Sequence, residues 1–191
     1  MVIAIKTLDY SKTVDNNVSS KAKNSILNKT LVIGASYVAL ECAGFLTSLG
    51  YDTTVMVRSI FLRGFDQQCA NIIGNHLEKG AGAKIIRPSV PESIEKLESG
   101  KLLVKMKNNE TGEITEDQFD TVLLAIGREP CTKEIGLENV NVELAKNGKV
   151  IVNDKEETNV DNVYAVGDIL LNRLELTPVA IQVRFRSLRI F

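Results

Sequence analysis

The stretch Thr30-Leu-Val-Ile-Gly34-Ala-Ser36-Tyr-Val-Ala39 decides how this chain of 191 residues is expected to fold. A short run of apolar, β-branched residues that stops at a glycine is typical of a strand buried on both faces of a parallel sheet. From Tyr37 to Leu46 the residues are mostly apolar at helical spacing, and Gly50 is placed to end a helix in the left-handed conformation. The pattern therefore predicts a strand that turns sharply into a helix.

Three further strands are expected to join the first one. Thr53–Val57 is the second strand, and a helix capped by Asp66 and continuing through Leu77 leads to the third strand, Lys84–Arg87. Phe119–Ile126 is an almost wholly apolar run and predicts a further buried strand. Strands that alternate with helices in this way indicate an α/β fold with a Rossmann-like, doubly wound parallel sheet.

Two regions interrupt or follow this pattern. Short alternating runs joined by Gly- and Asn-containing turns predict an antiparallel β-meander. The expected strands of the meander are Ser93–Glu98, Lys101–Lys107 and Glu113–Asp117. Beyond Pro130 the chain becomes polar and rich in turns, and two further strands are expected at Lys149–Val152 and Asn162–Asp168.

Composition and charge limit the possible functions. Hydrophobic residues make up 44% of the chain and charged residues 25%, which is typical of a globular protein rather than a disordered one. The formal net charge of −1 predicts no broad attraction to nucleic acid or to an anionic membrane. The cysteines, Cys42, Cys69 and Cys131, lack disulfide-framework, redox-pair or metal-ligand spacing. These features favour a cytoplasmic protein with a local binding site.

Gly34, Ser36 and Ala39 form a variant of the glycine fingerprint that binds dinucleotides. In that motif the first position allows a tight turn, the second lets the backbone approach a pyrophosphate, and the third lets helix and strand pack closely. Ser36 stands where the second glycine is usual. The alternative interpretation is a strand-to-helix turn with a purely structural role.

Arg58, Ser59 and Arg63 follow the second predicted strand. A site that prefers NAD usually carries an acidic residue there, whereas the 2'-phosphate of NADP needs cationic donors. Two guanidinium groups and a hydroxyl could hold such a phosphate through charge-assisted hydrogen bonds, which favours NADPH over NADH. The alternative is that both arginines are solvated surface charges.

Tyr37 and Glu41 are four residues apart on the first predicted helix, so both can project to one side near its amino end, where a nicotinamide would lie. The alternative is that Tyr37 is an aromatic residue at the edge of the core and Glu41 a favourable acid near the helix start. His76 is expected to be a solvated side chain rather than a catalytic base.

Five ordered motifs resemble those of the pyridine nucleotide-disulfide oxidoreductase family, and most closely the animal-type thioredoxin reductases and the thioredoxin glutathione reductases of flatworms. The similarity extends over residues 30–182. The motifs are Gly34–Phe45, Val55–Asp66, Ala125-Ile-Gly-Arg-Glu-Pro130, Thr158–Asp168 and Glu175–Gln182.

This resemblance implies roles for individual residues in the first predicted domain. Gly34, Ser36 and Ala39 would hold the NADPH pyrophosphate, and Tyr37 would cover the flavin and move aside for the nicotinamide. Glu41 would help to orient the nicotinamide side of the flavin. The 2'-phosphate would be bound by Arg58, Ser59 and Arg63.

The resemblance also implies a second, partial domain. Gly127 and Arg128 would form the loop by which the chain leaves the NADPH domain. Asp168 would bond the ribityl chain of FAD, and the segment from Thr177 to Ala180 would run beneath the isoalloxazine. The expected organisation is an arm at 1–29, an NADPH-binding domain at 30–128, part of an FAD-binding domain at 129–182 and a divergent tail at 183–191.

Several features of the family are not found in the sequence. An amino-terminal glycine fingerprint for FAD and a Cys-x-x-x-x-Cys pair would precede this region, and neither occurs in residues 1–29. The interface domain, with its His-Glu acid/base pair, would follow residue 182. The chain is therefore expected to be a fragment that holds no catalytic dithiol and is catalytically incomplete by itself.

The expected function of the whole protein is transfer of a hydride from NADPH to FAD and of electrons onward to thioredoxin or a similar protein disulfide, in a homodimer. One alternative is a flavoprotein dehydrogenase that uses NADPH and reduces a ferredoxin or quinone without a dithiol. Another is a non-enzymatic protein whose nucleotide-binding core serves as a sensor or interaction module.

Overall fold

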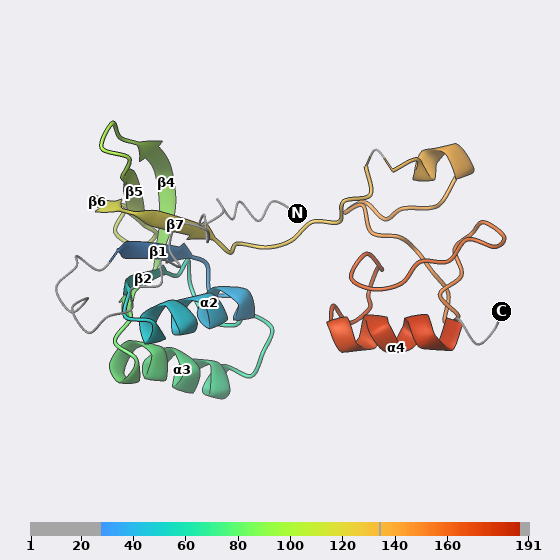
Figure 1. Ribbon diagram of the computed structural model, residues 1–191, viewed down its shortest axis with the longest axis horizontal. Coiled ribbons are helices and arrows are strands. Elements are labelled where there is room, and N and C mark those ends of the chain that lie inside the picture. Colours follow the sequence, from blue (N-terminus) through green and yellow to red (C-terminus); the bar gives the residue numbers. More distant parts are fainter. Residues whose placement is uncertain (1–27, 134, 188–191) are drawn as a thin grey trace, which may run out of the picture. The chain divides into compact units, whose positions relative to one another are not determined.

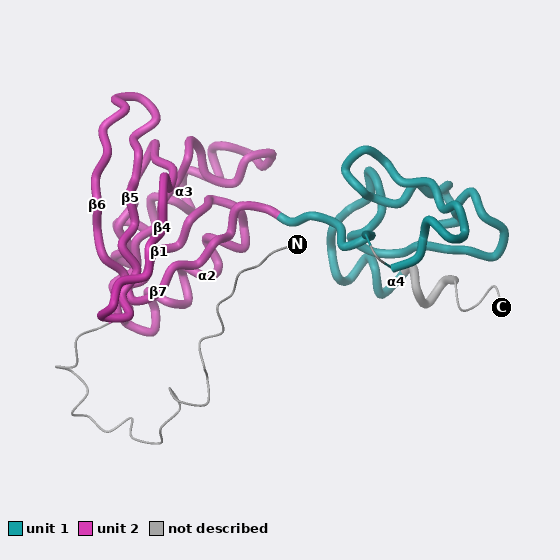
Figure 2. The backbone as a smooth tube through the Cα atoms, turned by 90° about the horizontal axis from the view of Figure 1, so that it is seen from above, with its two compact units in different colours: residues 1–2, 128–191 teal, residues 3–127 magenta. Residues whose placement is uncertain are grey.

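The computed structural model describes residues 28–133 and 135–187. Most of the expected arm at 1–29, and residues 188–191 of the expected tail, lie outside the described residues. The chain divides into two compact units, unit 2 ending at Gly127 and unit 1 beginning at Arg128 (Figure 2). Each unit is described by itself below.

Unit 2 is built on a four-stranded parallel sheet (Figure 1). Its strands, in spatial order, are β3 (Lys84–Ile86), β2 (Asp52–Met56), β1 (Lys29–Ile33) and β7 (Thr121–Leu124). The last four residues of β1 are buried, as expected for an apolar strand covered on both faces. The predicted α/β class with a Rossmann-like parallel sheet is confirmed.

Two helices follow the first two strands of this sheet. Helix α2 (Tyr37–Ser48) begins after Ser36, and Gly50 beyond its end has a φ of +87°. Helix α3 (Gln67–Asn75) begins after Asp66, whose carboxylate accepts the backbone N–H of Cys69 at 2.8 Å. Both predicted helix starts, and the predicted cap at Asp66, are therefore present.

The predicted single helix through Leu77 is wrong in its second half. Helix α3 ends at Asn75 and a π-helical turn, η2 (His76–Gly80), continues the chain. The wider turn keeps Leu77 buried while His76 is exposed, as expected for that histidine. The spacing of apolar residues predicts which side chains are buried. Over a stretch of about one turn it does not distinguish the hydrogen-bond pattern of an α-helix from that of a π-helix.

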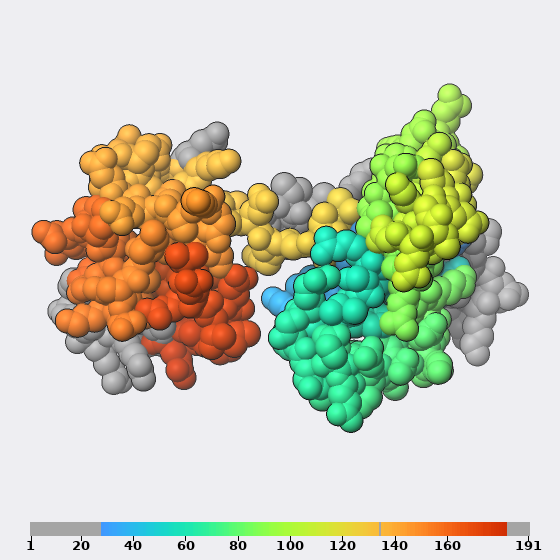
Figure 3. All heavy atoms as spheres, turned by 180° about the vertical axis from the view of Figure 1, so that it is seen from behind, coloured from blue at the N-terminus to red at the C-terminus, as the bar shows by residue number. Residues whose placement is uncertain are grey.

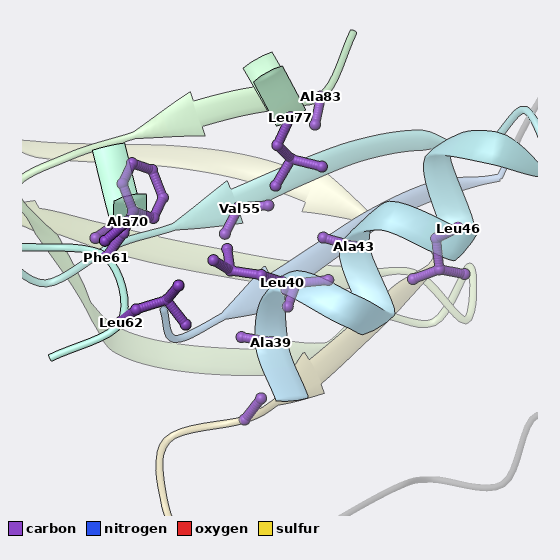
Figure 4. Close-up of a cluster of buried hydrophobic side chains, with 13 residues drawn as sticks. Ala39, Leu40, Ala43, Leu46, Val55, Phe61, Leu62, Ala70, Leu77 and Ala83 are labelled. Carbon is purple, nitrogen blue, oxygen red and sulfur yellow. The ribbon is translucent and has the colours of Figure 1, made fainter. Parts of the chain in front are cut away.

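The sheet of unit 2 is covered on both faces, because successive side chains of a strand point to opposite sides. Val32 and Val55 face the helices and pack in the cluster shown in Figure 4 with residues of α2, α3 and the loop between β2 and α3. Leu31, Ile33 and Met56 face the other way. Figure 3 shows this layering at the surface, where the green to yellow residues of the meander gather apart from the cyan and teal residues of the helical side.

The second face is covered by the antiparallel meander that the sequence predicted. Its strands are β4 (Ser89–Lys96), β5 (Leu102–Asn108) and β6 (Ile114–Phe119), in that spatial order. Val104, Met106 and Phe119 pack against the sheet. Strand β4 begins at Ser89, four residues before the predicted start. Pro91 does not prevent this, because β4 is an edge strand and its register shifts between Pro91 and Ser93, and proline is tolerated at such positions.

The predicted strand Phe119–Ile126 is two elements in the structure. Phe119 ends β6, and β7 begins only at Thr121. Asp120 divides them, because its backbone N–H donates to the Lys29 carbonyl at 2.8 Å and its carboxylate accepts the Lys29 N–H, also at 2.8 Å. The ammonium of Lys29 pairs with Asp117 at 2.5 Å, so the start of β1 is bound to the end of the meander.

Unit 1 contains a 3-10 turn, η3 (Leu137–Val140), and helix α4 (Thr177–Ser187). The strands predicted at Lys149–Val152 and Asn162–Asp168 are wrong: among the described residues these segments form only isolated bridges, from Val150 to Leu144 and Leu170 and from Tyr164 to Glu157. Val150 and Leu170 are nevertheless buried. Of these two, only Val150 belongs to a predicted strand, and Tyr164 and Val166 of the other predicted strand are 39% and 38% exposed. A strand also needs a neighbour that pairs over several residues.

Candidate functional site

The strand order of unit 2 places a candidate site at the carboxyl ends of its parallel strands. From β1 the chain passes to β2 and β3 on one side, and it later returns to β7 on the other side of β1. In open α/β sheets, ligands bind outside the carboxyl ends of the strands at this kind of switch point. Binding residues are therefore expected in the segments that follow β1, β2 and β7.

Gly34 lies where β1 passes closest to its neighbours. Its φ is +127°, and a Cβ atom built there would lie 2.3 Å from the carbonyl oxygen of Ala125, just after β7. Its backbone N–H donates to the carbonyl of Met56 at 2.9 Å. Only glycine fits between the ends of β2 and β7 in this conformation, so the first fingerprint position has a structural reason within the chain itself.

Ser36 joins the turn to both α2 and β7. Its Oγ accepts the backbone N–H of Ala39 at 3.3 Å, which makes it the N-cap of α2, and donates to the Ala125 carbonyl at 3.2 Å. Ala39 is fully buried, as the fingerprint requires of its third position. The backbone N–H groups of Tyr37 and Val38 have no intrahelical acceptor, and the first turn of α2 carries no acidic side chain. This helix end suits an anion.

Replacing Ser36 by alanine is expected to lower the free energy of unfolding by about 1 kcal/mol, because the N-cap of α2 is lost. Glycine at the same position is a better N-cap than alanine and is expected to cost only a few tenths of that amount. Urea unfolding followed by circular dichroism measures both variants. Equal losses for alanine and glycine would show that the cap does not stabilise the helix.

Tyr37 and Glu41 both lie on the solvent-facing side of α2. Tyr37 is 49% exposed, Glu41 is exposed, and Phe45, one turn further, is also exposed. Partial burial, and to a lesser extent the nearby charge of Glu41, raise the pKa of the Cys42 thiol. Cys42 is therefore a poor nucleophile, in keeping with the absence of redox spacing.

The loop after β2 brings two of its three predicted phosphate ligands together. The guanidinium of Arg63 donates to the hydroxyl of Ser59 at 2.8 Å. Arg58 is exposed next to the fully buried Val57, and its carbonyl accepts the side-chain amide of Asn109 at 3.0 Å. Among the described residues, no carboxylate forms an ion pair with Arg58 or Arg63.

Asn109 is a site residue that the sequence analysis missed. Besides its bond to Arg58, its backbone N–H donates to the carbonyl of Pro88 at 2.9 Å. It therefore joins the loops that follow β2 and β3 from the turn between β5 and β6. The Asn-rich turn was recognisable in the sequence, but no local signal says which distant loop such a turn contacts.

Gly127 and Arg128 are both exposed and lie at the boundary between the two units. Gly127 has a φ of +147°, and no atom lies within 4 Å of the position that a Cβ would take. Their predicted role in the loop stays a prediction.

Unit 1 contains a cavity with a volume of about 320 Å³, and the residues that line it include neither Asp168 nor Thr177. Asp168 is exposed and follows Gly167, whose φ is +88° and which packs against Ala180 of α4. Thr177 is exposed at the start of that helix. The residues that line the cavity are Glu156, Gly167, Leu170, Asn172, Arg173, Leu174, Val179 and Ala180.

Metal binding and membrane insertion have no support in the described part of the chain. No group of three or more His, Cys, Asp or Glu residues there is arranged to hold a metal ion. None of the helices in residues 28–133 and 135–187 has the length and apolar character that crossing a bilayer requires. Cys42 and Cys69 are free thiols.

Comparison with known proteins identifies the relatives of this chain. It is 50% identical over 163 residues to thioredoxin reductase SEP1 of Emiliania huxleyi, an alignment that covers 81% of this chain and 32% of that protein. Among solved structures it resembles the thioredoxin reductase of Lactococcus lactis in its FR conformation, with a TM-score of 0.72 and 27% identity over 86% of this chain and 52% of that one.

A second solved structure, the Cu(II) complex of the HOCl-induced flavoprotein disulfide reductase RclA from Escherichia coli, matches with a TM-score of 0.72 and 27% identity. It is covered over 35% of its length, and this chain over 85%. The chain thus spans from about a third to about half of the length of these relatives. The sequence model for pyridine nucleotide-disulphide oxidoreductases matches residues 4–183. The chain therefore belongs to the pyridine nucleotide-disulphide oxidoreductase family.

Proposed function

We propose that unit 2 is the NADPH-binding domain of a thioredoxin reductase-like flavoprotein disulfide reductase. The observation that carries the proposal is the pair of anion-binding features at one edge of the sheet. The capped amino end of α2 follows β1, and the loop with Arg58, Ser59 and Arg63 follows the adjacent strand β2. NADPH carries its pyrophosphate and its 2'-phosphate at a matching pair of positions.

The pyrophosphate would lie at the amino end of α2. The free N–H groups of Tyr37 and Val38 and the positive end of the helix dipole favour an anion there. Gly34 and Ala39 permit the close turn, and Ser36 fixes the direction of the helix. The fit rests on the donor set, because no acidic side chain opposes it in the first turn of α2.

The 2'-phosphate would be bound by Arg58, Ser59 and Arg63. The hydrogen bond between Arg63 and Ser59 already places one guanidinium beside one hydroxyl. Neither arginine is paired with a carboxylate of the described residues, so both charges are available to a ligand. Charge-assisted bonds to a phosphate are short and strong, and a planar guanidinium can make two of them.

Tyr37 and Glu41 would act at the nicotinamide end. When bound, NADPH supplies a hydride and FAD accepts it. The exposed ring of Tyr37 would shield the flavin face from water until the nicotinamide takes its place, and the exposed carboxylate of Glu41 would orient that side of the flavin. Both side chains are on the outer face of α2, where Tyr37 is half exposed and Glu41 is exposed.

Unit 1 would supply part of the FAD-binding domain. Asp168 would bond the ribityl chain, and Thr177 at the start of α4 would lie under the flavin ring. The turn at Gly167 supports this assignment, because it packs against Ala180 and so brings the segment of Asp168 next to the helix that begins at Thr177. Gly127 and Arg128 would form the connection from the NADPH-binding domain.

The whole protein would pass its electrons to thioredoxin or a similar protein disulfide, as a homodimer in the cytoplasm. The names of its relatives and the free thiols of Cys42 and Cys69 support this proposal. None of the chain's three cysteines lies at redox spacing from another, so the chain would bind nucleotide without reducing disulfides by itself.

The test is titration of the 191-residue chain with NADPH and with NADH, followed by isothermal calorimetry. We expect NADPH to bind at least about tenfold more tightly, because one or more charge-assisted bonds to its additional phosphate are each worth about 1.5 kcal/mol or more. Circular dichroism before the titration confirms that the chain is folded. Equal affinity for the two coenzymes would overturn the proposal.

A further inference from the structure

A third arginine lies beside the predicted phosphate loop. Arg87 follows β3, the strand next to β2, and the backbone on both sides of it is hydrogen bonded to Val57. The N–H of Val57 donates to the Ile86 carbonyl at 2.9 Å, and the Val57 carbonyl accepts the N–H of Ser89 at 3.0 Å. Because Arg58 comes directly after Val57, the two arginines begin from neighbouring points at the same edge of the sheet.

The guanidinium of Arg87 is oriented by an aromatic ring. Its central carbon lies 5.4 Å from the centroid of the Phe61 ring, within the range of a cation–π contact. Phe61 belongs to the segment between Arg58 and Arg63 and is only 4% exposed. Its ring is backed by Gly74 of α3, where a Cβ would come within 2.4 Å of it, and Figure 4 shows it beside α3. The buried Phe61 ring therefore holds the guanidinium of Arg87 beside the segment between Arg58 and Arg63.

The loops that bear Arg58 and Arg87 are also joined to each other. Asn109 donates its side-chain amide to the Arg58 carbonyl and its backbone N–H to the Pro88 carbonyl, next to Arg87. Arg87 is exposed, and no carboxylate of the described residues pairs with it. At the opposite end of β3, by contrast, Lys84 is neutralised by Asp52 at 2.9 Å.

We propose that Arg87 is a third guanidinium ligand of the 2'-phosphate and helps to set the preference for NADPH. The inference rests on the proposed NADPH site and adds one residue to it. A phosphate monoester carries close to two negative charges at neutral pH, which two guanidinium groups balance, but each of its three acceptor oxygens can accept more than one hydrogen bond, which leaves room for a third donor. A guanidinium stacked on Phe61 keeps its N–H edge free for such an anion while its plane is fixed.

The test compares the 191-residue chain with its Arg87→Ala variant in titrations with NADPH and with NADH. We expect the variant to bind NADPH about tenfold more weakly or worse and to bind NADH as the original chain does, within about twofold. Lys96→Ala is the matched control, since Lys96 is an exposed cation at the far end of β4, and it is expected to change neither affinity.

The outcomes separate this inference from the function on which it rests. If the unaltered chain binds both coenzymes equally, the NADPH site itself is wrong and this inference falls with it. If the unaltered chain prefers NADPH and Arg87→Ala keeps that preference, only the role of Arg87 is overturned. An equal loss for both coenzymes also overturns the phosphate contact. Arg87→Lys, which keeps the charge without the planar fork, is expected to fall between the two, and thermal unfolding by circular dichroism verifies that each variant folds.

Discussion

Replacing Gly34 by alanine is expected to lower the free energy of unfolding by about 3 kcal/mol or more. A methyl group at this position would lie 2.3 Å from the Ala125 carbonyl oxygen, and the φ of +127° is strained for any residue with a Cβ. Backbone strain of this kind costs about 1 to 3 kcal/mol, and a forced shift in a packed interior costs a similar amount again. Urea unfolding monitored by circular dichroism measures the loss.

Gly100→Ala is the matched control for this variant. Gly100 also has a positive φ, +84°, but no atom lies within 4 Å of the position that its Cβ would occupy. It is expected to lose only the strain contribution, about 1 to 2 kcal/mol. If Gly34→Ala were no more damaging than Gly100→Ala, the close approach of β7 to the turn after β1 would not constrain the fold.

Removing Arg58 and Arg63 together is expected to weaken NADPH binding by about 3 kcal/mol or more, a loss of about a hundredfold in affinity, since each charged hydrogen bond is worth about 1.5 kcal/mol at the least. NADH has no 2'-phosphate, so its affinity should barely change. Calorimetric titration of the Arg58→Ala, Arg63→Ala double variant with both coenzymes measures the difference. Equal losses for NADPH and NADH would contradict the assigned role.

A second double variant controls for the change in net charge. Lys96→Ala with Lys79→Ala removes two exposed cations of unit 2, one from the meander and one from the π-helical turn η2. It lowers the net charge by the same amount but is expected to leave both affinities unchanged, because exposed charges far from a ligand are screened by salt. A loss of NADPH affinity in this control would assign the effect to the overall field rather than to Arg58 and Arg63.

The parts of the fold that were predicted correctly are those fixed by short-range chemistry. The buried strand that ends at Gly34, the helix after Ser36 and the cap at Asp66 each follow from neighbouring residues alone. Burial was predicted only in part for unit 1, since Val150 is buried whereas Tyr164 and Val166 of the other predicted strand are exposed. The tendency of an apolar side chain to leave water is a local property of that side chain, whereas its actual burial also depends on the neighbours that the fold supplies.

The errors arose where a boundary depends on distant partners. The break between β6 and β7 follows from the bonds between Asp120 and Lys29, which are 91 residues apart. The early start of β4 at Ser89 depends on pairing with β5, and the proline within it would locally argue against a strand. Such tertiary contacts override local preference and leave no signal in a single sequence.

The candidate site was predicted to a similar extent. Ser59 and Arg63, four residues apart, were expected together and are hydrogen bonded. Arg87 and Asn109 were missed, because their place beside Arg58 depends on the register of the parallel sheet and on the position of the meander. Sequence proximity identifies the loop that carries the charges, and only the three-dimensional arrangement shows what surrounds it.

The two hydrogen bonds of Asn109 have a consequence for affinity. A ligand that must first order two independent loops loses part of its binding free energy as conformational entropy. Here the loop with Arg58 and the loop with Pro88 are both hydrogen bonded to Asn109 before any ligand binds. The loops that bear Arg58 and Arg87 are thus preorganised. More of the attraction between these arginines and a phosphate is therefore retained as net binding free energy.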